Sequence, residues 1–214
     1  MNGLYLVTDR NCCGPRLLDR VVLEALKGGC MCVQLREKNL PTRPFIEEAQ
    51  RIKAILAPFR VPLIINDRLD VALAVGADGL HIGQDDMPYT EARKWLGPEA
   101  IIGLSVEKWA DVEQAQDLDV DYLGVSPVFQ TPTKTDTTGA WGLDGIKKIR
   151  SFSRHPLVAI GGLNAGNVKD AVMAGADGIA VVSAICAASD PYQAACELDS
   201  IIRDALKNRN TLSQ

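Results

Sequence analysis

The sequence predicts a single (β/α)₈ TIM barrel, and three observations lead to that fold class. Eight strand-like apolar runs alternate with eight segments whose apolar residues recur at helical spacing. The segment GADGL at 76–80 recurs as GADGI at 175–179, each time between a helix and a strand, which indicates four units plus four units. A content of 47% hydrophobic residues in 214 suits one large α/β core. An open, doubly wound sheet is disfavoured because no G-x-G-x-x-G follows the first strand.

The predicted strands are short aliphatic runs that end at glycine, proline or polar residues, and they cover 3–9, 31–37, 62–67, 79–83, 101–106, 122–128, 156–162 and 178–185. The predicted helices cover 17–27, 44–56, 68–75, 89–96, 107–118, 143–152, 164–174 and 191–207. Gly28 and Gly76 are stop signals for the first and third helices, and Asn164 is the expected cap of the seventh. We expect one domain over 1–214 with a frayed tail at 208–214.

The composition argues against several classes of partner. A formal net charge of −4 gives no sustained basic field, so neither nucleic acid nor a membrane surface is expected as a partner. The N-terminus has no signal arrangement and no stretch reaches the length of a membrane span, which predicts a cytoplasmic protein.

The six cysteines include no C-x-x-C pair and are interpreted as reduced, with the roles of Cys12 and Cys13 left open. The oligomeric state is also open, and a homo-oligomer is compatible with the sequence.

Two aspartates lie at the ends of consecutive predicted strands, in the central unit 62–87. A right-handed crossover makes these strands parallel, so Asp67 and Asp86 emerge on the same rim of the sheet. Adjacent strands are about 4.8 Å apart, which lets two carboxylates share a hard cation such as Mg²⁺. Taken singly, Asp67 is better interpreted as a helix cap, and Asp85 or Asp86 as part of a solvated turn. The pair, with Asn66 beside it, favours a metal site.

Polar groups also gather at the end of the second predicted strand. Gln34, Arg36 and Lys38 alternate with apolar or acidic residues and therefore share one side of the strand. Basic groups beside a carboxylate pair are suited to a diphosphate bound as its Mg²⁺ salt. Surface salt bridges would explain Arg36 and Lys38 individually, but not their place next to a metal-type pair.

A second anion site is predicted where phosphate commonly binds in this fold, at the ends of the seventh and eighth strands. There AIGG at 159–162 and VVS at 181–183 combine close backbone approach with the Ser183 hydroxyl, which suits a monophosphate. Ser105 and the TPTK segment at 131–134 lie between the two sites in the chain, although a merely solvated polar loop would also explain 129–142. His81 alternates with Leu80 and Ile82 and is expected to face the barrel interior in a hydrogen-bonded core role.

Six motifs stand in order at these strand ends: QLREK at 34–38, IINDR at 64–68, GADGLHIGQDD at 76–86, TPTK at 131–134, AIGG at 159–162 and VVS at 181–183. Each motif is weak alone. Together they span nearly the whole chain, and the sequence resembles the thiamine phosphate synthase (thiamine-phosphate pyrophosphorylase) family. That family joins 4-amino-2-methyl-5-hydroxymethylpyrimidine diphosphate to 4-methyl-5-(2-hydroxyethyl)thiazole phosphate and releases diphosphate and thiamine phosphate.

The resemblance implies a role for each matching residue. Asp67 and Asp86 are expected to hold Mg²⁺. The implied contacts to the pyrimidine diphosphate are Gln34, Leu35, Arg36, Glu37, Lys38, Asn66, Ser105 and Lys134. The implied contacts to the thiazole phosphate are Thr131, Pro132, Thr133, Gly162, Val182 and Ser183. Catalysis is assigned by the resemblance to Lys134, Arg36, Lys38 and Ser105, with a dissociative substitution that needs no nucleophilic side chain.

Two other functions remain compatible with the fold. A thiazole tautomerase of the same fold would shuttle protons without metal, but it places a histidine in strand six, where this chain has Ser126. Ser126 also departs from the synthase, which commonly has glycine there. A non-catalytic phosphate-sensing barrel is the second alternative, and the complete set of acidic and basic residues argues against it.

Overall fold

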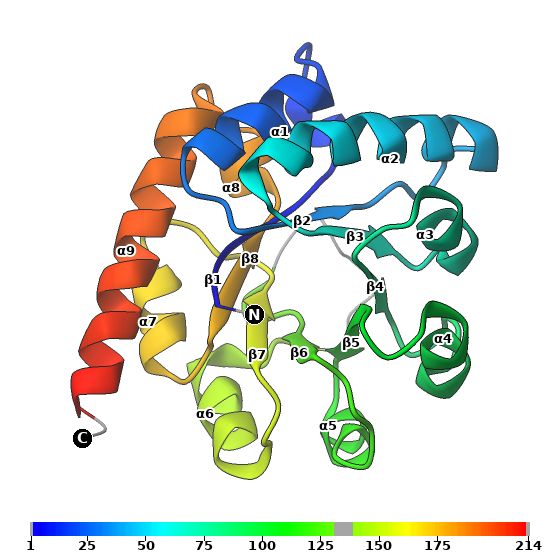
Figure 1. The fold of residues 1–214 in the computed structure, drawn as a ribbon. Coiled ribbons are helices and arrows are strands. Elements are labelled where there is room, and N and C mark those ends of the chain that lie inside the picture. The colour runs from blue at the N-terminus through cyan, green and yellow to red at the C-terminus, as the bar shows by residue number, and fades with distance from the viewer. Residues whose placement is uncertain (1, 131–138, 213–214) are drawn as a thin grey trace.

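Eight parallel strands close into a barrel in chain order, as Figure 1 shows. The computed structural model describes residues 2–130 and 139–212. The strands are β1 (Gly3–Val7), β2 (Cys32–Leu35), β3 (Leu63–Asn66), β4 (Gly79–Ile82), β5 (Ile101–Val106), β6 (Tyr122–Val125), β7 (Leu157–Ile160) and β8 (Gly178–Val181). β8 pairs in register with β1, Gly178 opposite Gly3, so that the sheet has no free edge. The predicted barrel is therefore confirmed.

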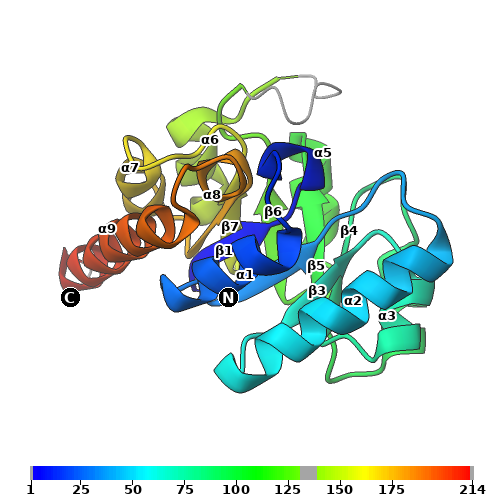
Figure 2. The ribbon, with the colours of Figure 1, turned by 90° about the horizontal axis from the view of Figure 1, so that it is seen from above.

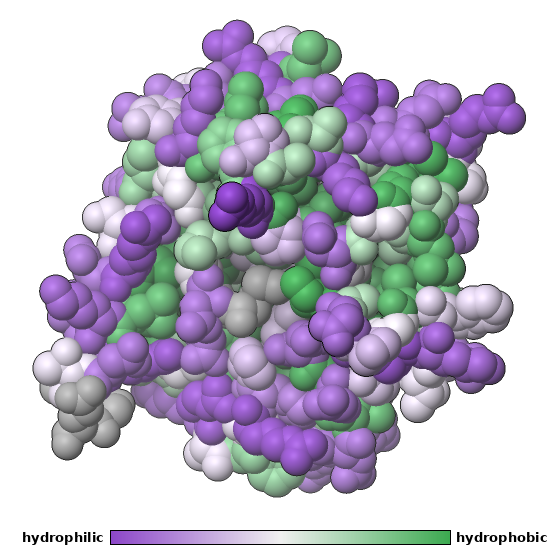
Figure 3. Space-filling view, in the orientation of Figure 1, coloured by the Kyte–Doolittle hydropathy of each residue, from purple (hydrophilic) through white to green (hydrophobic). Residues whose placement is uncertain are grey.

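Helices surround the barrel (Figure 1) and alternate with its strands. They are η1 (Arg10–Cys13), α1 (Leu18–Lys27), α2 (Thr42–Leu56), η2 (Ala57–Phe59), α3 (Leu69–Val75), α4 (Tyr89–Leu96), α5 (Trp109–Ala115), α6 (Gly142–Phe152), α7 (Val168–Met173), α8 (Ser183–Cys186) and α9 (Pro191–Leu212). Figure 2 shows η1 and α8 side by side, and contacts between them confirm that closeness. The face in Figure 3 is mainly hydrophilic with small apolar groups. Within the described residues no helix is long and apolar enough to cross a membrane.

Side chains of each strand alternate between two apolar layers. Tyr5 and Val7 of β1 belong to a small cluster inside the barrel, whereas Leu4 and Leu6 belong to the larger layer under the helices. The same alternation turns Gln34 inward and Leu35 outward. The interior is therefore partly polar, and its polar groups lie on the same faces as the site residues.

The internal repeat has a structural cause. Asp78 Oδ2 accepts a hydrogen bond from the backbone N–H of Leu63 at 2.8 Å, and Asp177 Oδ2 accepts one from Leu157 at 2.9 Å. Each carboxylate thus binds the first residue of the preceding strand and ties two neighbouring strand starts together. The repeat is explained by barrel assembly and needs no role at the carboxyl rim.

Strand eight is shorter than predicted. It ends at Val181, and residues Ser183–Cys186 form the short helix α8, whose residues 183–185 had been predicted as part of the strand. A continuous apolar run does not distinguish a strand from a buried helical turn, and this explains the error.

Helix boundaries also differ from prediction, and the largest differences are at the start of α7 and the end of α9. Asn164 does not cap α7, which begins at Val168; instead, the Asn164 side chain accepts a hydrogen bond from Gly166 N at 2.9 Å within the preceding turn. α9 continues past Lys207 to Leu212, so 208–212 is not frayed. Arg209 explains the extension, because it donates to Val172 O at 3.0 Å and Ala176 O at 2.7 Å and holds the last turns against α7.

Candidate active site

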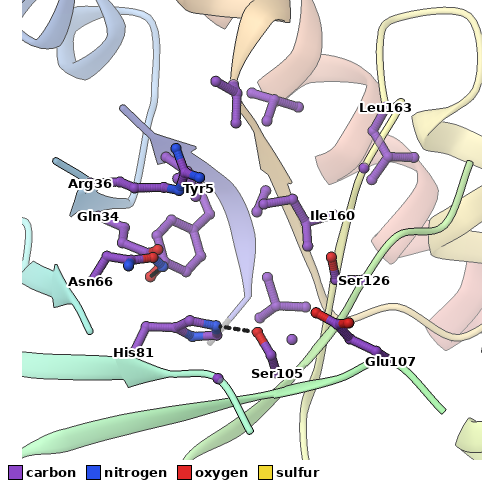
Figure 4. A pocket seen from close by; sticks show the side chains of 18 of the residues that line it. Tyr5, Gln34, Arg36, Asn66, His81, Ser105, Glu107, Ser126, Ile160 and Leu163 are labelled. Atoms are coloured by element: carbon purple, nitrogen blue, oxygen red, sulfur yellow. Dashed lines mark hydrogen bonds between the residues drawn. The ribbon is translucent and has the colours of Figure 1, made fainter. Parts of the chain in front are cut away.

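A cavity of about 790 Å³ opens at the carboxyl ends of the strands, and all eight strands contribute to its lining. Figure 4 shows the labelled side chains converging on it from opposite sides of the barrel. Tyr5 and Tyr122 also line it, and both are nearly inaccessible to solvent. Nearly all the predicted site residues that are described lie in its wall, with two exceptions given below.

One part of the rim, here called the first arc, carries the predicted acidic and basic groups: Gln34, Arg36, Lys38, Asn66, Asp67 and Asp86. Lys38 Nζ forms an ion pair with Asp67 Oδ2. Asp67 has φ of +62°, an uncommon backbone conformation for a residue with a side chain, and its N–H donates to His81 O at 2.8 Å. The strained backbone thus turns the Asp67 carboxylate towards Lys38 at the rim.

Asp86 is the second acidic group of the first arc. Its Oδ2 accepts a hydrogen bond from Gly83 N at 2.7 Å, which fixes the carboxylate above the end of β4. Burial raises the pKa of Asp86, and the nearby Asp67 carboxylate raises it further. A divalent cation would relieve this repulsion, and two carboxylates supply the oxygen donors that Mg²⁺ takes. No group of three or more metal-binding His, Cys, Asp or Glu side chains occurs among the residues described, so phosphate and water would have to complete the shell.

Leu35 and Glu37 do not line the cavity, unlike the other members of the predicted stretch 34–38. Leu35 is fully buried under the helices. Glu37 lies 3.4 Å from Arg10 Nε, and Arg10 also pairs with the buried Glu48 of α2. Burial and the Glu48 carboxylate raise the pKa of Glu37 to about 7. The chain after β2 thus turns Glu37 towards Arg10 and Glu48, whereas Arg36 and Lys38 face the cavity.

The opposite part of the rim, here called the second arc, comprises Gly161 and Gly162 after β7, with Val182 and Ser183 after β8. Gly161 has φ of +103° and Gly162 has φ of +66°, conformations that glycine adopts readily. A Cβ at Gly162 would lie 2.8 Å from Phe129 Cβ and 2.9 Å from Gln130 O. Glycine is therefore required there by the backbone itself, independently of any phosphate. The second arc contains no acidic side chain, which suits an anion.

Between the arcs, Ser105 of β5 faces the cavity, and His81 Nε2 lies 2.9 Å from its Oγ (Figure 4). The inward orientation predicted for His81 is confirmed. Ser126, directly after β6, also lines the cavity at the position where the tautomerase has a histidine. The predicted contacts Thr131, Pro132, Thr133 and Lys134 lie outside the described residues.

The sequence interpretation missed several lining residues: Tyr5, Gln84, Glu107 and Tyr122. The period of two would have found Tyr5 and Tyr122, because each shares a face with other inward-facing residues of its strand. Gln84 Nε2 donates to Ser105 O at 2.6 Å, a contact between the loop after β4 and strand β5 that no periodic pattern predicts.

Comparisons with known proteins identify the family of this chain. The family model described as thiamine monophosphate synthase matches residues 4–185. Thiamine-phosphate synthase of Albidiferax ferrireducens is 57% identical over 199 residues, which cover 93% of this chain and 91% of that protein. Thiamine-phosphate synthase of Leptospira biflexa is 52% identical, with 92% of this chain and 96% of that protein covered.

A solved structure extends the similarity to three dimensions. The thiamine phosphate pyrophosphorylase from Pyrococcus furiosus superposes with a TM-score of 0.87 at 38% identity. The match covers 95% of this chain and 96% of that one, so the whole barrel is shared and not only its rim.

Proposed function

The chain belongs to the thiamine monophosphate synthase family and is a transferase, and from this premise we propose how its rim carries out the reaction. The substrates are 4-amino-2-methyl-5-hydroxymethylpyrimidine diphosphate and 4-methyl-5-(2-hydroxyethyl)thiazole phosphate. The products are thiamine phosphate and diphosphate. The observation that carries the proposal is a single cavity with two unlike anion sites on its rim.

The first arc is suited to the diphosphate. Asp67 and Asp86 would hold Mg²⁺, which supplies positive charge against the diphosphate when bound. Arg36 and Lys38 add charge and hydrogen-bond donors on the same side of β2. Lys38 is held at the rim by its ion pair with Asp67, so its ammonium group is already near the carboxylates.

The second arc is suited to the monophosphate. The backbone of Gly161 and Gly162 leaves room at the end of β7, and Ser183 offers a hydroxyl at the end of β8. The two substrates would then extend from opposite arcs towards the middle of the cavity. With the two phosphate ends held at opposite arcs, the reacting atoms of both substrates would face each other in the middle of the cavity.

The bond that breaks joins the pyrimidine methylene carbon to a diphosphate oxygen, and its electron pair leaves with the diphosphate. The aminopyrimidine ring stabilises the resulting carbocation, and the lone pair of the thiazole nitrogen forms the new C–N bond. Arg36 and Lys38 stabilise charge on the departing group, so the protein supplies orientation and electrostatics instead of a nucleophile. Ser105, whose Oγ lies 2.9 Å from His81 Nε2, would contact the pyrimidine.

The direct test is to mix the two substrates with Mg²⁺ and measure diphosphate. We expect release only when both substrates are present, and reversible loss of release on chelation. Thiazole isomerisation without diphosphate release would identify the tautomerase. Binding of both ligands with no turnover would identify the phosphate sensor.

A further inference from the structure

A chain of hydrogen bonds crosses the barrel interior from the first arc to Ser105. Gln34 Nε2 donates to Tyr5 Oη at 2.9 Å, and Tyr5 Oη lies 2.9 Å from Tyr122 Oη. The chain then continues from Tyr122 Oη to His81 Nδ1 at 3.0 Å and from His81 Nε2 to Ser105 Oγ at 2.9 Å. These five side chains come from five different strands.

The amide at one end sets the direction of the chain. An amide nitrogen only donates, so Tyr5 accepts from Gln34 and has its single proton available for Tyr122. Tyr122 in turn has its proton available for His81 Nδ1. A neutral imidazole that accepts at Nδ1 carries its proton on Nε2, where it donates to Ser105 Oγ.

The barrel interior is shaped around this arrangement. The His81 and Tyr122 rings are stacked, with centroids 5.5 Å apart and planes inclined by 24°. A Cβ at Gly103 would overlap the Tyr122 ring and lie 2.6 Å from His81 Nδ1, and one at Gly124 would lie 2.8 Å from His81 Cε1. Two glycines on adjacent strands therefore leave the space that the ring pair fills.

The phenols keep their protons, as the chain requires. Both Tyr5 and Tyr122 are nearly inaccessible to solvent. Burial raises the pKa of each phenol well above its ordinary value, because an ionised oxygen would lose its hydration.

We infer that His81 and Tyr122 are positioning residues that make the Ser105 hydroxyl a hydrogen-bond donor to the substrate. Because Ser105 Oγ accepts from His81 Nε2, its own proton is directed into the cavity. On the proposed function, the matching acceptor is a ring nitrogen of the aminopyrimidine, which has lone pairs but no proton. A chain running the other way would leave Ser105 with only lone pairs, which suit the exocyclic amino group.

The histidine tautomer tests this direction without any substrate. The chain has two histidines, so two-bond ¹H–¹⁵N correlation spectra of the labelled protein contain only His81 and His155. His155 Nε2 lies 3.0 Å from Ala115 O, a pure acceptor, and serves as an internal reference for a proton on Nε2. We expect the same pattern for His81. A proton on His81 Nδ1 would overturn the inference, whatever reaction the protein catalyses.

A double-mutant cycle tests whether the chain acts through Ser105. Tyr122→Phe keeps the ring and removes the hydroxyl, and we expect about tenfold weaker calorimetric binding of the pyrimidine diphosphate with Mg²⁺. The same change in a Ser105→Ala background should cost less than about twofold, because Ser105 no longer transmits it. Thiazole phosphate binding should be unchanged in all four proteins.

Tyr5→Phe is the second variant, one link further from Ser105, and it keeps the cycle usable if Tyr122→Phe does not fold. It should give a smaller loss that also disappears with Ser105→Ala. If either loss persists at full size in the Ser105→Ala background, the tyrosines act through packing and the positioning role is wrong.

Discussion

Among single residues, the two neighbouring aspartates Asp85 and Asp86 share a charge but not an environment. Asp86 is half-buried, and its side chain accepts a hydrogen bond from Gly83 N, whereas Asp85 is exposed. Asn at position 86 keeps an oxygen acceptor for Gly83 and removes only the charge. Asp86→Asn is therefore a substitution that should leave the fold intact.

We predict that Asp86→Asn raises the Mg²⁺ concentration for half-maximal activity by about tenfold or more, because a carboxylate ligand is lost. Asp85→Asn is the matched control, with the same charge change one position away, and should shift it by less than about threefold. Titration of initial diphosphate release against Mg²⁺ measures both. Equal shifts in the two variants would show a general field effect and would contradict a ligand role for Asp86.

Burial and the Glu48 carboxylate raise the pKa of Glu37 from 4.5 to about 7, against the opposing effect of Arg10. Between these pH values the native protein holds a proton that the unfolded chain releases. Stability contributed by the protonated Glu37 is therefore lost as pH rises from about 4.5 to 7. The Asp9 carboxylate raises the pKa of Glu37 further, so it adds to this loss of stability.

Glu37→Gln should reduce this loss, because glutamine is neutral at every pH. We predict a smaller fall in the urea midpoint between about pH 5 and 7.5 than in the native protein. Glu47 is exposed on α2, next to Glu48 in sequence. Glu47→Gln should leave the pH dependence unchanged. Parallel pH profiles for native protein and Glu37→Gln would place the titration elsewhere.

Some residues of the site could be predicted from the sequence and others could not. Asp67 and Asp86 follow from βαβ geometry, and Gln34, Arg36 and Lys38 follow from alternation on one strand. The inward orientation of His81 could be predicted but its hydrogen-bond partners could not, because Tyr122 and Ser105 lie on other strands and their spacing in sequence has no relation to their contact. An inward tyrosine has the same pattern as a core residue until its hydroxyl partner is known.

At the scale of elements, the repeated aspartate joins strands to the helices outside them. Asp177 Oδ2 accepts from Leu157 N and lies 3.0 Å from Arg150 Nη1 of α6, while Oδ1 lies 2.8 Å from Arg209 Nη2 of α9. One carboxylate therefore connects β7, α6 and α9. Such a connection explains why α9 stays ordered to Leu212, which helix propensity alone did not predict.

We predict that Asp177→Ala lowers the free energy of unfolding by about 3 kcal/mol, because a backbone donor and two partly buried arginines lose their acceptor. Asp177→Asn keeps one acceptor oxygen for Leu157 N and should lose less. Asp144→Ala, which breaks the exposed pair with Lys147, is the control and should cost under about 1 kcal/mol. Urea unfolding measures all three, and equal losses at positions 177 and 144 would contradict the linking role.

Element boundaries were predictable where glycine ends a helix and unpredictable where apolar residues continue. Gly76 has φ of +57° and ends α3 as expected. After β8 the run from Val181 to Cys186 is apolar except for Ser183, and a single serine inside an apolar run does not by itself separate a strand from a helical turn.

For the whole molecule, closure of the barrel is what places two distant segments on one rim. β2 to β4 carry the first arc and β7 to β8 carry the second, and β8 pairs with β1 to bring them round a common cavity. The sequence predicts both arcs because a parallel barrel gathers all carboxyl ends on one face.

The independence of the two arcs can be tested by opposite charge changes. Gly162 is a poor site for a probe, since a side chain there meets both a positive φ and the backbone of Gln130. Ser183 is better, because it is exposed and begins α8, where a carboxylate is favourable to the helix. Ser183→Asp should therefore fold, yet place a negative charge where the second arc would receive a phosphate.

We predict that Ser183→Asp weakens thiazole phosphate binding by about tenfold or more and leaves Mg²⁺-dependent binding of the pyrimidine diphosphate within about twofold. Asp86→Asn should give the reverse pattern, and Ser183→Asn, which adds the same bulk without charge, should give a much smaller loss than Ser183→Asp. Calorimetric titration of each protein with each ligand separately avoids the coupling that ordered binding would introduce, and thermal melts establish that each variant is folded. If Ser183→Asp and Asp86→Asn each weaken both ligands to the same extent while remaining folded, the rim acts as one anion site and the division into two arcs is wrong.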